Sequence, residues 1–295
     1  MARPESAIFS DAPAKGWLPW GLLAPVLTVI FVLIPVLATL APMAALGLVD
    51  DSGDPIGTNG LIAFLLPPFA LTGLLVLAWV RFVERRPLAT IGLTGARPVR
   101  TFLIGLAIGA ATILAVVVAI WLAGGFAASA FAPAFLSPAA LGGIAILLAA
   151  FAVQASVEEL LFRGWLLSLA ARKFGLPVAV ALSSITFAFL HFSPSQPLLM
   201  TVNMLLFSGF ACCWAIRAGN VWGVMGWHVG WNWLLATGFE LPVTGLDAGL
   251  PALLVQLGPA GPDWLTGGAD GPEGSILCTL FFLAGIALLT RRRRG

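Results

Sequence analysis

Long apolar stretches, separated by short segments that hold most of the charged residues, dominate this chain of 295 residues. A helix needs about 20 consecutive, mostly apolar residues to cross a bilayer. Eight stretches approach that length, and we predict a transmembrane helix in each of them: Leu18–Ala41, Leu61–Val83, Thr101–Ala123, Ala139–Leu169, Pro177–Phe192, Leu198–Ile216, Val221–Phe239 and Ser275–Thr290. The fourth is too long for one straight crossing, so we expect it to tilt or to continue past the membrane surface. The pattern therefore predicts an all-α fold, a polytopic membrane bundle of about eight transmembrane helices.

The distribution of positive charge predicts the orientation of this bundle. In an eight-span arrangement all 15 Lys and Arg residues fall on one side of the membrane, whereas the loops on the other side contain acidic residues and no basic ones. Lys and Arg collect in cytoplasmic loops. We therefore predict that the N- and C-termini are both cytoplasmic. The compact, Ala- and Gly-rich chain favours a bacterial cytoplasmic membrane.

The composition narrows the class of protein. The chain is 60% hydrophobic and 9% charged, whereas a soluble domain carries about a quarter charged residues. We interpret residues 1–295 as a single integral membrane domain, with a core of polar motifs at about 139–239. The lipid bilayer is an expected partner, and nucleic acid is not.

Two adjacent glutamates follow the apolar part of the fourth predicted helix, in the sequence EELLFRG. Charged residues within membrane segments are costly and are functional candidates by default. Glu159 and Arg163 are four residues apart, so on a helix they share a face and are expected to pair. Glu158 lies about 100° around the helix and stays available for acid–base chemistry. The alternative is a structural ion pair beside a partly hydrated acid.

The chain has only two histidines, and each lies in an apolar stretch beside a second candidate residue. Phe187 and His191, in FAFLHF, are four residues apart, so the phenyl ring should stack on the imidazole. His228 and Asn232, in GWHVGWNW, have the same spacing, so the imidazole and the amide should point the same way. Each pair taken alone is also explained by packing inside a helix bundle.

The candidate residues lie at roughly similar depths: Glu158, His191 and Asn232 are about 20 Å from the expected cytoplasmic ends of their helices, and His228 is about 14 Å from its end. One site can therefore gather a carboxylate, two imidazoles and an amide. Glu158 and His191 would deprotonate a water molecule, while His228 and Asn232 would donate hydrogen bonds to the oxyanion that forms when this water attacks a carbonyl. Alternatively, a zinc ion would activate the water, with Glu158, His191 and His228 as its ligands. The usual H-E-x-x-H signature of zinc proteases is missing, so we commit to no cofactor.

At these residues the chain resembles the CPBP family of intramembrane proteases, which includes the type 2 CAAX prenyl endopeptidase and bacteriocin-processing, Abi-like immunity proteins. The three motifs of the family read here as Glu158-Glu159-x-x-x-Arg163, Phe187-x-x-x-His191 and His228-x-x-x-Asn232, in the expected order. The resemblance implies endoproteolysis of a peptide or protein substrate in or at the membrane. It implies Glu158 as the base, with Glu159, Arg163 and Phe187 in supporting positions.

Two other functions remain open from the sequence. The motif residues would also suit a non-catalytic membrane scaffold or a bacteriocin-immunity protein, in which they serve only packing. A proton-coupled transporter that uses Glu158 and His191 as a relay is a further alternative, although the chain has no inverted repeat or paired broken helices.

Overall fold

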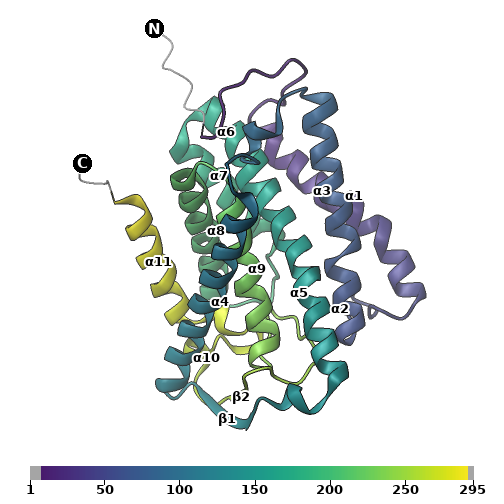
Figure 1. The fold of residues 1–295 in the computed structure, drawn as a ribbon, viewed down its shortest axis with the longest axis vertical. Coiled ribbons are helices and arrows are strands. Elements are labelled where there is room, and N and C mark those ends of the chain that lie inside the picture. Colours follow the sequence, from purple (N-terminus) through teal and green to yellow (C-terminus); the bar gives the residue numbers. More distant parts are fainter. Residues whose placement is uncertain (1–7, 292–295) are drawn as a thin grey trace.

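The computed structural model describes residues 8–291, which form an elongated bundle made mostly of helices (Figure 1). The α-helices are α1 (Leu23–Ala45), α2 (Gly57–Leu65), α3 (Pro67–Ala78), α4 (Pro98–Leu122), α5 (Pro138–Glu159), α6 (Leu167–Phe174), α7 (Leu176–Leu190), α8 (Leu198–Ala218), α9 (Trp222–Gly238), α10 (Asp263–Thr266) and α11 (Ile276–Thr290). Two π-helical segments, η1 (Trp79–Val83) and η4 (Leu160–Leu166), continue α3 and α5, and short 3₁₀ turns are η2 (Leu88–Ile91), η3 (Pro133–Leu136), η5 (Gly268–Asp270) and η6 (Pro272–Gly274).

Helical segments lie over all eight apolar stretches that the sequence marked as spans. Within the described chain, five helices are long and apolar enough to cross a membrane: Leu23–Ala45, Gly57–Val83, Pro98–Leu122, Pro138–Phe174 and Leu198–Ala218. The helices α7 and α11 are apolar but shorter. The protein is thus an integral membrane protein with a mostly helical fold, and the count of eight crossings stays a prediction.

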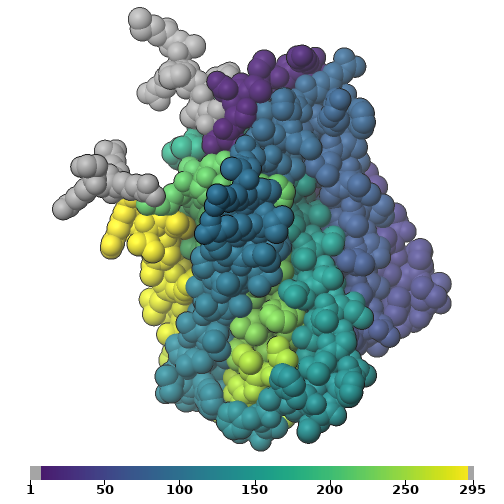
Figure 2. All heavy atoms as spheres, viewed as in Figure 1, coloured from purple at the N-terminus to yellow at the C-terminus, as the bar shows by residue number. Residues whose placement is uncertain are grey.

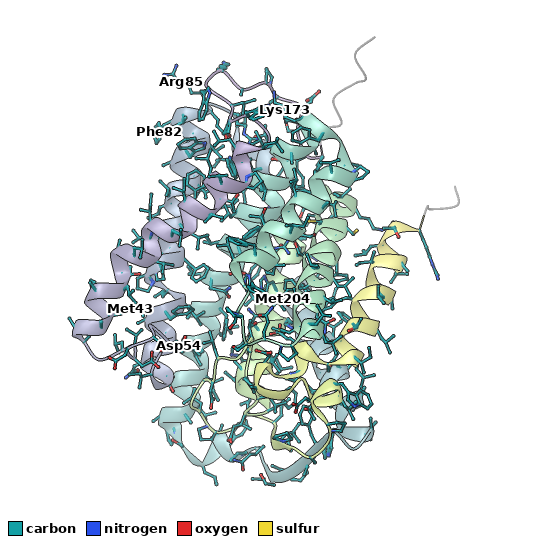
Figure 3. The ribbon with its side chains drawn as sticks, turned by 180° about the vertical axis from the view of Figure 1, so that it is seen from behind. Met43, Asp54, Phe82, Arg85, Lys173 and Met204 are labelled. Carbon is teal, nitrogen blue, oxygen red and sulfur yellow. The ribbon has the colours of Figure 1, made fainter. Side chains whose placement is uncertain are left out.

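The two ends of the bundle differ in charge. The start of α1 and the end of α11 lie at the same end of the bundle as α6, whereas β1, β2 and α10 lie at the other end (Figure 1). Arg85 and Lys173 lie at the first of these ends, and Asp54 lies away from it (Figure 3). This arrangement agrees with the charge separation along the sequence, and the side of the membrane that each end faces stays a prediction.

A small β-sheet is the departure from the all-α prediction. Strand β1 (Phe126–Phe131) pairs antiparallel with β2 (Val255–Pro259), with a bulge between Ala128 and Ala130. The two strands come from connections far apart in the chain. Neither connection contains an alternating apolar and polar pattern long enough to predict a strand. The sheet forms because backbone groups of the two connections satisfy each other's hydrogen bonds.

Glycines bring α4 and α9 into backbone contact. Figure 2 shows α4 lying over α9 on this face of the molecule. A Cβ atom at Gly226 would lie 1.9 Å from a backbone oxygen of α4, and one at Gly230 would lie 2.1 Å from another. A Cβ atom at Gly109 would lie 1.9 Å from the backbone oxygen of Trp227. Gly226 and Gly230 form a G-x-x-x-G on α9, a pattern that permits such close helix approach. The packing fixes the helix that carries His228.

Candidate active site

The two glutamates lie where the longest helix changes its geometry. The segment Pro138–Phe174 is continuous over 37 residues, and Glu158 and Glu159 are the last residues of α5 before the π-helical segment η4. Short π-helical segments occur frequently at functional sites. Trp165 within η4 donates a hydrogen bond of 2.7 Å to Glu84, so the loop after η1 anchors this segment. Helical spacing in the sequence does not predict the π geometry.

The predicted pair between Glu159 and Arg163 is present and fully buried. Oε1 of Glu159 lies 3.1 Å from Nη1 of Arg163, and neither side chain is exposed. The guanidinium lies 4.5 Å from the ring centre of Phe187 and 5.9 Å from that of Phe207. Aromatic faces attract a desolvated cation, so this charge is held by one carboxylate and by aromatic rings.

His191 presents one nitrogen to Glu158. The residue follows the last residue of α7, and its Nδ1 lies 2.8 Å from the carbonyl oxygen of Phe187. A carbonyl only accepts, so Nδ1 carries the proton and donates it. The other nitrogen, Nε2, lies 3.7 Å from Oε1 of Glu158. The ring of Phe187 stacks on the imidazole with centres 4.1 Å apart, as its spacing predicted.

His228 is held between the two glutamates. Its Nδ1 lies 2.9 Å from Oε1 of Glu159, and its Nε2 lies 3.8 Å from Oε2 of Glu158. The Glu158 carboxylate thus faces the Nε2 atoms of both histidines, at separations longer than a direct hydrogen bond. A water molecule can join polar groups that are too far apart for a direct hydrogen bond. Among the described side chains, Oε2 of Glu158 is buried and has no hydrogen-bond partner.

Asn232 lies one helical turn beyond His228 on α9, beside Gln154 of α5. Nδ2 of Asn232 donates a hydrogen bond of 3.4 Å to Oε1 of Gln154, and both residues are buried. Sequence reasoning did not place Gln154 in the site. The available signal was its position four residues before Glu158, in a run whose only other polar residue is Ser156.

Phe207 of α8 is a second residue that sequence reasoning missed. Its ring stacks on that of Phe187 with centres 5.5 Å apart, and it meets the imidazole of His228 edge-on at 4.7 Å. The chain contains 20 phenylalanines, and nothing in the sequence distinguishes Phe207 from the other 19. Its role follows only from the way α8 packs between α7 and α9.

The polar residues open into one apolar cavity of about 420 Å³. Glu158, His191, His228, Asn232 and Gln154 all line it, together with apolar residues of α1, α2, α3, α5 and α8. Met204, also in its wall, lies near the middle of the molecule (Figure 3). Along the continuous helix of α5 and η4 the lining extends from residue 151 to residue 162, which is about 16 Å at about 1.5 Å per residue. The site therefore lies inside the bundle, in the wall of a mostly apolar cavity.

The zinc alternative required Glu158, His191 and His228 as a set of ligands. Within residues 8–291, no group of three or more His, Cys, Asp or Glu side chains is arranged to hold a metal ion. Nε2 of each histidine faces a different oxygen of Glu158. The donor set as arranged does not fit a metal ion, so the proposed hydrolysis has no metal-dependent step.

Comparison with known proteins found one family match. Residues 138–234 match the family model of the Rce1-like type II CAAX prenyl endopeptidases. The matched segment is similar to an Rce1-like domain and makes up about a third of the chain. It begins at the start of α5 and ends within α9, so it includes all seven residues of the three motifs. The match confirms the resemblance to the CPBP family and supports a CAAX-type intramembrane protease. No curated protein and no solved structure was found to match the chain.

Proposed function

We propose that the protein is an intramembrane endopeptidase that hydrolyses a peptide bond of a membrane-associated protein or peptide, with a water molecule activated by Glu158 and His191. The observation that carries the proposal is the position of Glu158. Its carboxylate lies between the Nε2 atoms of two histidines whose Nδ1 atoms are engaged elsewhere, and all three side chains line the same apolar cavity.

The proposed first step is the attack of water on the scissile carbonyl. The water is held between Oε1 of Glu158 and Nε2 of His191, the nitrogen left without a proton by the Phe187 contact. Glu158 takes one proton as the water oxygen bonds to the carbonyl carbon. The carbon–nitrogen bond then breaks, and the same proton passes from Glu158 to the leaving amine. Atoms and charge balance without a covalent enzyme intermediate.

His228 and Asn232 are proposed to stabilise the oxyanion. With Nδ1 donating to Glu159, Nε2 of His228 donates only when the ring carries a second proton. Because Glu159 holds Nδ1, Nε2 lies on the side of the ring that faces Glu158, where a proton on it would face the developing negative charge. Asn232 contributes the N–H of Nδ2 that Gln154 does not use. Oriented donors of this kind commonly contribute about 10²–10³-fold in rate.

The decisive experiment compares protein termini in host membranes that carry wild-type protein, Glu158→Gln or Asp51→Asn. Asp51 is exposed, lies outside the cavity lining and makes no side-chain hydrogen bond in the described structure. Asp51→Asn therefore serves as the control for Glu158→Gln, because each variant replaces one carboxylate with an amide. We expect mass spectrometry to find termini produced by wild type and Asp51→Asn but not by Glu158→Gln, at equal membrane abundance. Identical termini in all three strains would overturn the protease proposal and favour a scaffold or immunity protein.

We also propose that residues 1–295 form one membrane domain that crosses a bacterial cytoplasmic membrane eight times, with both termini cytoplasmic. The basic end of the bundle, where α1 starts and α11 ends, supports this orientation (Figure 1). Reporter fusions after residues 50, 124 and 260 test it. Cytoplasmic reporter activity at any of these three loops would contradict the orientation.

A further inference from the structure

Gln154 has no part in the mechanism above, yet it lies in the cavity wall beside the reacting groups. It is buried on α5, one helical turn before Glu158, and both residues line the cavity. An uncharged amide in such apolar surroundings is costly unless its donors and acceptors find partners. Its acceptor has one, because Oε1 accepts the hydrogen bond from Asn232.

The amide nitrogen of Gln154 remains open to the cavity. Within residues 8–291, Nε2 makes no hydrogen bond. It is also not one of the polar side-chain atoms that are fully buried without a partner, so part of its surface is accessible. Since Oε1 is turned to Asn232 and the side chain lines the cavity, the N–H groups of Nε2 are accessible from it. They are therefore donors available to a bound molecule.

Other hydrogen-bond donors of the cavity wall are already engaged. The hydroxyls of Thr39, Thr72 and Thr244 donate to Pro35, Pro68 and Glu273 respectively. Each histidine uses its Nδ1 proton on Phe187 or Glu159. Nε2 of His228 and the second N–H of Asn232 are assigned to the oxyanion in the proposed mechanism. Among the described lining side chains, the N–H groups that remain free belong to Gln154. A peptide that enters this apolar space has few other places to satisfy its carbonyl groups.

The spacing of the two groups matches an extended peptide. Gln154 and Glu158 are separated by one helical turn, about 6 Å along α5. In an extended chain, carbonyl groups on the same side are two residues apart, about 6.6–6.8 Å. We propose that Gln154 is a substrate-binding residue, which donates a hydrogen bond from Nε2 to the backbone carbonyl two residues from the scissile bond. The substrate then lies extended along α5. This inference rests on the proposed proteolysis.

The test uses a synthetic peptide with the sequence cleaved in the terminus comparison, carrying a fluorophore and a quencher on opposite sides of the cleaved bond. Wild type, Gln154→Met and Gln256→Met are compared in proteoliposomes. Gln256 lies on β2 outside the cavity and provides the same substitution as a control. We expect kcat/KM to fall about tenfold for Gln154→Met, the loss of one hydrogen bond in the transition state, and to stay unchanged for Gln256→Met.

Peptides with a single thioamide separate binding from indirect effects, because sulfur accepts hydrogen bonds weakly. One thioamide is placed two residues before the scissile bond and another two residues after it. We expect one of them to lower kcat/KM with wild type and to cause no further loss with Gln154→Met. Equal losses with both proteins would overturn the inference and leave Gln154 as a support for Asn232. Absence of Glu158-dependent cleavage would instead refute the proposed function itself.

Discussion

Nδ1 of His228 lies 2.9 Å from Oε1 of Glu159, on the side of the ring away from the Nε2 that faces Glu158. An ionised carboxylate only accepts hydrogen bonds, so the contact places a proton on Nδ1 and fixes the orientation of the ring. The same oxygen lies 3.1 Å from Arg163. The second glutamate of the motif therefore has two roles, because it compensates a buried cation and orients the histidine proposed for the oxyanion.

Replacing Glu159 with Gln tests the orienting role. The amide keeps the size of the side chain but loses the carboxylate that orients His228 and holds the proton on its Nδ1, so we expect kcat to fall about a hundredfold or more with little change in KM. The measurement is steady-state kinetics in proteoliposomes with the fluorogenic peptide. A variant with kcat within about twofold of wild type would show that His228 does not need Glu159.

Removing Arg163 tests the cost of the buried ion pair. Arg163→Met leaves Glu159 buried without its cation, and breaking such pairs costs about 3–5 kcal/mol. We expect a marked fall in the unfolding temperature in detergent. The double variant Glu159→Gln, Arg163→Met removes both charges and should recover most of the lost stability while remaining inactive. A double variant less stable than Arg163→Met would contradict the ion-pair explanation.

Much of the candidate site followed from helical spacing in the sequence. The pairs Glu159–Arg163 and Phe187–His191 meet because residues four apart share a helix face, and the structure contains both contacts. The apolar runs likewise located the helices. These features are local, so a single sequence is enough to predict them.

The remaining features depend on packing between segments far apart in the chain. The contact of His228 with Glu159, the aromatic contacts of Phe207 and the β1–β2 pairing all join different elements. No periodic pattern encodes such contacts. Gly105 and Gly109 on α4 are a partial exception, because a second G-x-x-x-G could have indicated the partner of α9.

Metal removal distinguishes the two ways of activating water. In the proposed mechanism Glu158 and His191 act directly, so protein that has been dialysed against a strong chelator should retain its kcat. The measurement is activity before and after dialysis, with the metal content determined in parallel. A loss of activity that zinc restores would overturn the direct mechanism and support Glu158, His191 and His228 as metal ligands.

The contact between α4 and α9 predicts that Gly226 cannot accept even a methyl group without loss. A Cβ atom there would lie 1.9 Å from the carbonyl oxygen of Phe102, a backbone atom of a packed helix, so the helices must separate by about an ångström or more. His228 lies only two residues further along α9, and its position relative to Glu158 changes with the helix. We expect Gly226→Ala to lower both the unfolding temperature and kcat.

Gly142→Ala is the matched control for that substitution. Gly142 also lies within a helix, α5, and a Cβ atom there meets nothing within 4 Å. Alanine is favoured over glycine within a helix by about 0.5–1 kcal/mol, so this variant should be as stable as wild type or slightly more stable, with unchanged kcat. If Gly226→Ala behaved like Gly142→Ala, the close packing of α4 on α9 would not be what positions His228. Opposite behaviour of the two variants would tie the geometry of the site to this one helix contact.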